Sequence, residues 1–279
     1  MSYFLRVYGG EDKPIGKVLG QVYPELPYAL LARLLRQKDV KVDGVRVKES
    51  HIVSRGSTLD LFCTPAMVRL VEVYRDDNVL VLYKPKGVES DGEHSFASLA
   101  AYVYGDEVRL MHRLDTNTDG LLLFAIGRRA YDLLYAAMRE HRIVKYYRAR
   151  VHGTWGEPTC LAGYLSKDAD AGKVRIYDAP KEGAVDVRCW VTPVARGRDS
   201  TLVDVRLEGG KTHQLRAQLA HAGHFILGDG KYGVDAINAA MGYKRQQLTA
   251  YRLRFDMPGD PLGLNDKDIV LPERWLTTK

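Results

Sequence analysis

The chain has 279 residues, of which 46% are hydrophobic and 27% are charged, a composition typical of globular proteins. Its net charge of +6 arises from 41 basic and 35 acidic residues, an excess too small to define a partner by itself. No apolar run approaches the roughly 20 residues that span a bilayer, and the first residues lack the regions of a signal peptide, so we expect a cytoplasmic protein without membrane association.

Residues 1–64 are predicted to form a small N-terminal domain. Its patterns predict a helix, a hairpin that turns at Asp43-Gly44, and a strand, over residues 29–36, 40–47 and 58–62. A larger second domain is expected over residues 68–279.

Positive charge gathers in this first domain, where six Lys or Arg stand against two Asp between Arg33 and Lys48. The pattern Leu-x-x-Leu-Leu-Arg-x-x-x-Val-x-Val-x-Gly-x-x-Val resembles the small RNA-binding domain named after ribosomal protein S four. The resemblance implies four candidate RNA contacts: Arg33, Arg36, Lys38 and Lys41. The alternative is a small αβ module whose basic surface is only solvated.

The rest of the chain is rich in apolar, strand-like runs. Strands are predicted over residues 79–83, 120–126, 145–151 and 202–207. Helices are predicted over residues 129–140 and 212–222. Because these elements do not follow a strict strand–helix–strand order, we expect an α+β domain with a largely antiparallel, mixed sheet.

Asp115 is the first candidate for chemistry, in the segment His112-Arg113-Leu114-Asp115. It lies on a predicted loop directly before the buried strand 120–126, which gives the loop a rigid support. Arg113 is placed to reach an RNA phosphate. On its own this pattern also fits an ordinary turn carboxylate.

The strand over 145–151 places Tyr147, Ala149 and Val151 on one face, because alternate side chains of a strand share a face. An aromatic ring on the inner face can stack on an extruded base. Core packing is the alternative interpretation of Tyr147.

The segment Thr212-His213-Gln214-Leu215-Arg216 begins a predicted helix. His213 and Arg216 are three residues apart and point the same way on a helix. Arg216 can pair with a carboxylate from elsewhere in the chain and hold it ionised. A surface arginine is the alternative.

Together these segments resemble the RluA-type pseudouridine synthases. The family patterns His-Arg-Leu-Asp-x-x-Thr-x-Gly-Leu-Leu-Leu, Lys-x-Tyr-x-Ala, Gly-x-Thr-His-Gln-Leu-Arg and Gly-Asp-x-x-Tyr-Gly are met in order between about residues 70 and 255. Three departures concern substrate choice more than activity: Asp119 where Ser is usual, Phe225 where Pro is usual, and no Thr within 184–188.

The resemblance implies that Asp115, Tyr147 and Arg216 are the catalytic residues and that Arg113 and His213 contact RNA. Asp115 either attacks the sugar or base covalently or removes a sugar proton. The implied reaction needs no cofactor and no metal. Ribosomal RNA of the large subunit is the favoured substrate and transfer RNA a possible one, for an enzyme expected to be a monomer.

Two other function classes compete with this interpretation. A non-catalytic RNA-binding or ribosome assembly factor explains the basic cluster but not the joint presence of the three catalytic candidates. A metal-dependent hydrolase would use Asp115 with the histidines, but their spacing fits no zinc or two-metal signature. The three cysteines lie far apart and form no Cys-x-x-Cys pair, which argues against a zinc site or a disulfide framework: Cys63, Cys160 and Cys189.

Overall fold

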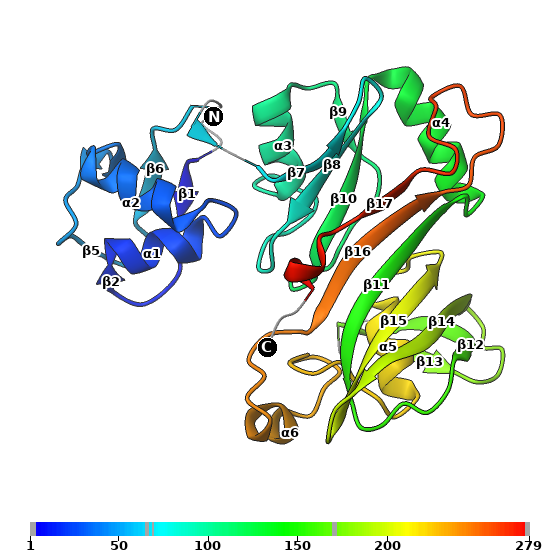
Figure 1. The fold of residues 1–279 in the computed structure, drawn as a ribbon. Helices are drawn as coiled ribbons and strands as arrows, with labels where there is room; N and C mark the ends of the chain where they lie inside the picture. The colour runs from blue at the N-terminus through cyan, green and yellow to red at the C-terminus, as the bar shows by residue number, and fades with distance from the viewer. Residues whose placement is uncertain (1–3, 65–66, 69, 169–171, 277–279) are drawn as a thin grey trace.

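A computed structural model describes residues 4–64, 67–68, 70–168 and 172–276. The N-terminal part forms a separate group of elements in Figure 1, coloured blue to cyan. It contains β1 (Arg6–Val7), β2 (Lys13–Pro14), α1 (Ile15–Val22), α2 (Tyr28–Arg36), β3 (Val40–Val42), β4 (Val45–Arg46), β5 (Ile52–Val53) and β6 (Thr58–Leu61). We call residues 4–64 the N-terminal unit.

The N-terminal unit is held by a four-stranded antiparallel sheet in the order β1-β6-β3-β4 and by a core under its two helices. In α2, Leu30, Leu31, Leu34 and Leu35 are buried at helical spacing. The predicted helix over 29–36 and the hairpin at Asp43-Gly44 are both confirmed. Whether this unit is an RNA-binding domain of the S four type stays a prediction.

The remaining strands form one eleven-stranded sheet. Its order is β13-β12-β14-β15-β11-β16-β10-β8-β7, with β17 on β16 and β9 on β10. The strands are β7 (Glu72–Arg75), β8 (Val79–Lys84), β9 (Val108–Leu110), β10 (Asp119–Ile126), β11 (Ile143–His152), β12 (Thr159–Asp168), β13 (Lys173–Tyr177), β14 (Val185–Arg196), β15 (Ser200–Glu208), β16 (Leu248–Phe255) and β17 (Asp268–Val270).

Among the described strands of this sheet, only β10 and β16 pair in parallel, so the sheet is mixed and largely antiparallel as predicted. The helices are α3 (Phe96–Tyr104), α4 (Arg128–Arg139), α5 (Gln214–His221) and α6 (Asp235–Ala240), with a short 3-10 turn at Glu273–Trp275. The α+β class is therefore confirmed. No helix in the described ranges is long and apolar enough to cross a membrane.

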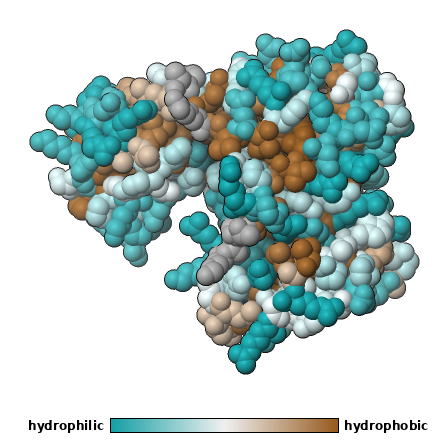
Figure 2. All heavy atoms as spheres, viewed as in Figure 1, coloured by the Kyte–Doolittle hydropathy of each residue, from teal (hydrophilic) through white to brown (hydrophobic). Residues whose placement is uncertain are grey.

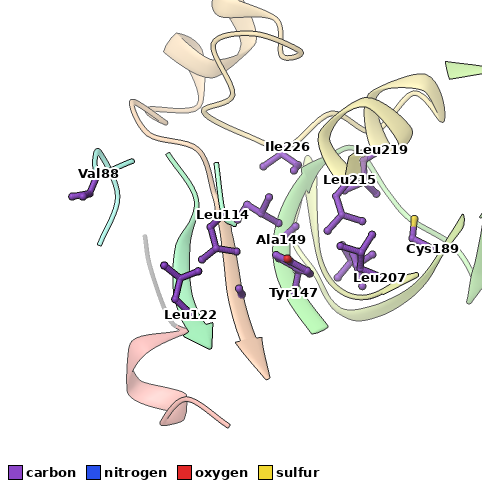
Figure 3. Close-up of a cluster of buried hydrophobic side chains, with 14 of the residues drawn as sticks. Val88, Leu114, Leu122, Tyr147, Ala149, Cys189, Leu207, Leu215, Leu219 and Ile226 are labelled. Atoms are coloured by element: carbon purple, nitrogen blue, oxygen red, sulfur yellow. The ribbon is translucent and has the colours of Figure 1, made fainter. Parts of the chain in front are cut away.

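Alternation along the strands creates a core on each face of the sheet. In β10, Leu122 and Phe124 belong to the core that also contains residues of α3 and α5, while Leu121 and Leu123 belong to the core that contains residues of α4. The first of these cores also contains Tyr147, shown among its apolar neighbours in Figure 3. Burial on both faces explains why the sequence of β10 is an uninterrupted run of apolar residues after Gly120.

Three loops meet at one edge of the sheet, because β8 ends where β10 and β16 begin. Gly120 lies opposite Lys84 at the end of β8 and opposite Ala250 near the start of β16. The approach at this point is close: a Cβ on Gly120 would lie 2.1 Å from the Ala250 carbonyl oxygen, at a φ of +124°. We call this side of the sheet the loop edge.

The N-terminal unit contacts the larger part of the chain through α3. The ring of Phe4 lies edge-on to that of Tyr102, with centroids 5.5 Å apart. The Tyr102 hydroxyl donates to the carbonyl of Cys63 at 2.7 Å, and Leu99 is buried in the core of the N-terminal unit. Apolar and polar contacts therefore both join the two parts.

Candidate active site

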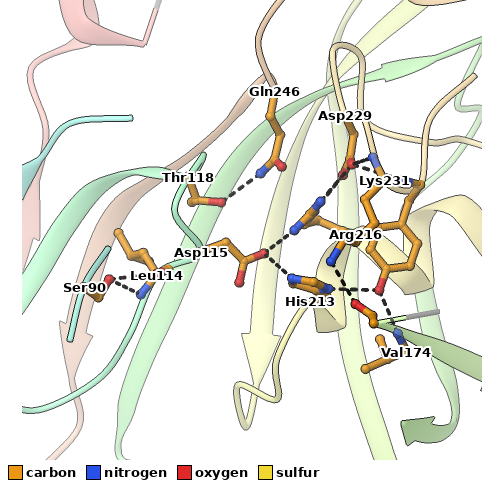
Figure 4. Close-up of polar contacts among 12 residues, drawn as sticks. Ser90, Leu114, Asp115, Thr118, Val174, His213, Arg216, Asp229, Lys231 and Gln246 are labelled. Atoms are coloured by element: carbon orange, nitrogen blue, oxygen red, sulfur yellow. Dashed lines mark hydrogen bonds and ion pairs between the residues drawn. The ribbon is translucent and has the colours of Figure 1, made fainter. Parts of the chain in front are cut away.

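Asp115 lies on the loop edge, in the turn between β9 and β10. The preceding residue, Leu114, is buried in the core, and Ser90 holds both of its backbone groups. The Ser90 hydroxyl donates to the Leu114 carbonyl at 2.7 Å and accepts from the Leu114 N–H at 2.9 Å. The Thr118 N–H closes the turn by donating to the Asp115 carbonyl at 3.0 Å. The carboxylate thus projects from a backbone fixed on both sides (Figure 4).

Two further side chains, Lys84 and Gln246, donate hydrogen bonds to this turn. The fully buried ammonium of Lys84 donates to the carbonyls of Pro85, Val88 and Thr116 at 2.9, 2.8 and 3.3 Å. The Gln246 amide donates to the Thr118 hydroxyl at 2.8 Å. Burial lowers the pKa of Lys84 to about 8, although the charges of Asp119 and Asp115 oppose this shift.

Arg216 brings a buried cation to Asp115. It lies in α5, and its Nη1 donates to Asp115 Oδ2 at 2.8 Å. Its Nε and Nη2 bind both oxygens of Asp229 at 2.7 and 2.9 Å. Arg216 thus pairs with a carboxylate from elsewhere in the chain, as the sequence predicted, and Asp229 is a second partner that the sequence did not predict.

Arg216 and Asp229 stabilise each other's charged forms. Burial opposes the Arg216 charge, but the hydrogen bonds and charges of Asp229 and Asp115 outweigh it and raise the Arg216 pKa. Burial on its own raises the pKa of Asp229. The hydrogen bonds that Asp229 accepts from Arg216 and from the N–H groups of Lys231 and Tyr232, with the charge of Arg216, outweigh this effect, so the net pKa is lowered. Both side chains therefore stay charged at neutral pH.

His213 stands directly before α5 with φ 55°. Its Nδ1 lies 3.0 Å from the Tyr232 hydroxyl, which itself accepts from the Val174 N–H at 2.8 Å. Burial is the main cause that lowers the His213 pKa, so the ring is neutral at neutral pH. The other ring nitrogen of His213, Nε2, lies 3.9 Å from Asp115 Oδ2.

Tyr147 completes the site from β11. Lys145, Tyr147, Ala149 and Val151 are all buried, which confirms the predicted shared face of the last three. A small cavity of about 50 Å³ is lined by Asp115, Tyr147 and Arg216 together. Burial and then the Asp115 charge raise the pKa of the Tyr147 phenol, so it stays protonated at neutral pH.

Two larger cavities open from this point. One of about 550 Å³ borders Asp115, Arg113 and His213, and one of about 650 Å³ borders Tyr147 and Arg113 on the other side. Arg113 is exposed and lines all three cavities. These spaces have the size of pockets that hold small organic ligands.

The four basic candidates of the N-terminal unit lie elsewhere. Arg33, Arg36 and Lys38 are exposed on that unit, and Lys41 is half-buried with its Nζ 4.8 Å from the Phe62 ring centroid. None of them lines the cavities around Asp115. Any contact they make with a ligand is therefore separate from the Asp115 site.

The histidines do not converge on Asp115 as a metal site would require. His221 contacts Asp178 at 2.9 Å, and His224 contacts the carbonyl of His152 at the same distance. Within the described ranges, no group of three or more His, Cys, Asp or Glu side chains could hold a metal ion.

Comparison with known proteins decides between the remaining function classes. The family model for RNA pseudouridylate synthase matches residues 78–221, which contain Asp115, Tyr147 and Arg216. The chain belongs to the RNA pseudouridylate synthase family. It is accordingly an isomerase, and the cavity around Asp115 is the candidate active site of a pseudouridine synthase.

Relatives of this pseudouridine synthase include two bacterial enzymes named ribosomal large subunit pseudouridine synthase C. The Vibrio cholerae protein is 30% identical over 263 residues, with 84% of this chain and 82% of the relative covered. The Salmonella typhimurium protein is 31% identical over 264 residues, with 84% and 82% covered.

A solved structure, the human RNA pseudouridylate synthase domain containing 1, has the same fold. Its TM-score is 0.63 at 22% identity, over 73% of this chain and 83% of that one. At this identity the likeness concerns the fold alone.

Sequence patterns missed several residues that shape the site, although some of them carried a signal. Asp229 belongs to the Gly-Asp-x-x-Tyr-Gly pattern, but nothing local assigns it to Arg216. Ser90, Lys84 and Gln246 act on backbone or hydroxyl groups that are 24, 32 and 128 residues away. Such partners follow only from the order of strands in the sheet.

Proposed function

We propose that this pseudouridine synthase isomerises uridines of large-subunit ribosomal RNA, with Asp115 as the catalytic carboxylate. The names of the relatives support the choice of RNA. The observation that supports the role of Asp115 is its ion pair with Arg216, which is itself paired with Asp229, at a cavity that Tyr147 also lines. Ion pairing and a fixed turn hold one ionised carboxylate at a defined point in that cavity.

The reaction breaks the bond between the sugar and a nitrogen of uracil and forms a bond from the same sugar to a carbon of the rotated base. The proton displaced from that carbon is balanced by a proton gained on the freed nitrogen. No redox change and no hydrolysis occur, so the proposal includes neither a cofactor nor a metal. Asp115 acts either by covalent attack or by removing a sugar proton.

A uridine in folded RNA must leave its stack before it reaches Asp115, at a cost of roughly a few kcal/mol. Tyr147 is buried beside the carboxylate and stacks on the extruded base in this proposal. Arg113 is exposed and lines the cavities. In this proposal it fills the space that the extruded uridine leaves in the RNA, and it contacts the RNA backbone. His213 presents its Nε2 beside the same carboxylate and contacts RNA.

Residues 1–64 serve in this proposal as an RNA-binding domain, and residues 68–279 as the catalytic domain. Arg33, Arg36 and Lys38 are exposed and so available to phosphates. The enzyme acts as a monomer in the cytoplasm, since one chain supplies Asp115, Tyr147 and Arg216 and ribosomal RNA is the proposed substrate.

Asp115→Asn tests the central assignment. Pseudouridines are mapped by carbodiimide-based primer extension in ribosomal and transfer RNA from cells that lack the gene and carry either variant or wild type. We expect no modification with Asp115→Asn and unchanged RNA affinity. Asp77→Asn is the matched control, because Asp77 is exposed between β7 and β8, away from the loop edge. Normal modification by Asp115→Asn would overturn the role of Asp115, and modification of transfer RNA alone would overturn the substrate.

A further inference from the structure

A separate cavity of about 600 Å³ lies on the loop edge, outside the candidate active site. It is bordered by Pro24 of the N-terminal unit, by Tyr83 and Lys86 at the end of β8, and by the loop that includes Lys244 and Arg245. Figure 2 shows the surface hollowed between the N-terminal unit and the part that carries α6. We call this cavity the basic cleft.

The basic cleft has an excess of positive charge that is only partly neutralised. Asp119 is buried and already accepts from the hydroxyls of Tyr83 at 2.7 Å and Thr249 at 2.8 Å. Its Oδ1 lies 3.6 Å from the Lys86 ammonium, which also donates to the Gln246 carbonyl at 2.6 Å. Lys86 is therefore fixed, with 14% of its side chain exposed.

Lys244 and Arg245 provide the free charge of the basic cleft. Both are exposed, and no carboxylate among the described residues pairs with either side chain. Fully solvated cations on a concave wall attract polyanions, because binding releases the counterions of the phosphates.

Three hydrogen bonds join the wall of the basic cleft to the turn that carries Asp115. Gln246 follows Arg245 and donates to Thr118, three residues after Asp115. Lys86 binds the carbonyl of the same Gln246, and the neighbouring Gly87 N–H donates to the carbonyl of Thr116 at 2.8 Å. The basic cleft and the Asp115 turn therefore lie close together on the loop edge, where one RNA strand can contact both.

We infer that the basic cleft binds the phosphate backbone of the substrate RNA beside the target uridine, with Lys244 and Arg245 as its phosphate contacts. The inference rests on the proposed function, since it takes the RNA at Asp115 as its occupant. Asp119 has a positioning role here, because it anchors Lys86 in the wall of the cleft.

The test measures filter binding of a large-subunit ribosomal RNA transcript at several salt concentrations. For Lys244→Ala/Arg245→Ala we expect about a ten-fold loss of affinity near 0.1 M salt and a decrease of roughly 1.4 to 1.8 in the slope of log K against log salt, the effect of two lost phosphate contacts. The charge-conserving Lys244→Arg/Arg245→Lys should bind like wild type.

Arg129→Ala/Arg254→Ala is the matched control. It removes the same charge from exposed positions at the start of α4 and near the end of β16, away from the loop edge. Equal salt slopes for the two alanine pairs, or wild-type affinity of the Lys244 and Arg245 pair, would overturn the inference. Pseudouridine formation by wild type on the same transcript is scored separately, so a failed function and a failed cleft give different results.

Discussion

Arg216 binds Asp115 with only one of its nitrogens, Nη1, at 2.8 Å. Its other two nitrogens donate to Asp229, which is 1% exposed and also accepts from the N–H groups of Lys231 and Tyr232. The planar guanidinium therefore takes its orientation from Asp229 and transmits it to Asp115. Asp229 positions the Asp115 carboxylate without touching it.

Asp229→Asn should lower kcat by about 100-fold with little change in KM, because misplaced catalytic groups cost about that factor. Asn keeps an oxygen for the N–H groups of Lys231 and Tyr232 but removes the charge that holds Arg216. Steady-state kinetics on an unmodified fragment of large-subunit ribosomal RNA give both constants.

The matched control is Asp204→Asn. Asp204 binds Arg148 in the same two-pronged way, at 2.8 and 3.1 Å, but on β15 and away from Asp115. Both variants should unfold more easily, and only Asp229→Asn should lose turnover. If kcat falls equally in the two, the effect of Asp229 is one of stability.

Tyr147→Phe should lower kcat by roughly 100-fold and leave KM nearly unchanged, the size expected for loss of a proton-transfer group. The raised pKa keeps the phenol protonated, so in this prediction it serves as a proton donor beside Asp115, while the ring that remains in the variant still stacks. Tyr146→Phe is the control, since its side chain faces the other side of β11 and contacts Arg252. Wild-type turnover by Tyr147→Phe would limit Tyr147 to stacking.

Local patterns predicted those parts of the fold that depend on periodicity. The alternation around Tyr147 gave its face correctly, and the helix expected over 129–140 is observed as α4, Arg128–Arg139. Each of these depends on neighbours within a few residues, which a single sequence displays directly.

Local patterns do not predict contacts between residues that are far apart in the sequence. Gln246 meets Thr118 only because β16 enters the sheet between β11 and β10. Asp229 lies in a loop whose position follows from a close approach: a Cβ on Gly228 would lie 2.0 Å from the Arg245 carbonyl oxygen. No periodicity encodes such neighbours, so resemblance located the catalytic candidates and the structure supplied their supports.

His112 should make the fold sensitive to acid. Burial, aided by the charge of Lys145, lowers its pKa to about 3, and its Nε2 accepts from the Leu123 N–H at 3.3 Å. Below the pKa of about 6.5 that His112 has in the unfolded chain, the unfolded chain binds a proton that the native chain does not bind. The free energy of unfolding therefore decreases as the pH decreases. At pH 5 this linkage removes at most about 2 kcal/mol.

Urea unfolding of wild type and His112→Asn at pH 7.5 and pH 5 checks this expectation. The variant should lose less free energy of unfolding between the two pH values than wild type does. His141→Asn serves as the control, because His141 is exposed and its φ of 58° is one that Asn tolerates. The linkage would be refuted if His112→Asn and wild type lost equal stability.

Lys84→Met should weaken both the fold and the reaction. The side chains have similar length, but Met leaves the carbonyls of Pro85, Val88 and Thr116 without their shared donor. Each buried, unsatisfied carbonyl costs about 1–3 kcal/mol, less what a water entering the space restores. We expect a loss of about 2–4 kcal/mol in the free energy of unfolding. A several-fold lower kcat should accompany it, because Thr116 directly follows Asp115. Lys48→Met, at an exposed position of the N-terminal unit, should change neither quantity. Unaltered unfolding and turnover in Lys84→Met would show that the Asp115 turn holds its shape without the buried amine.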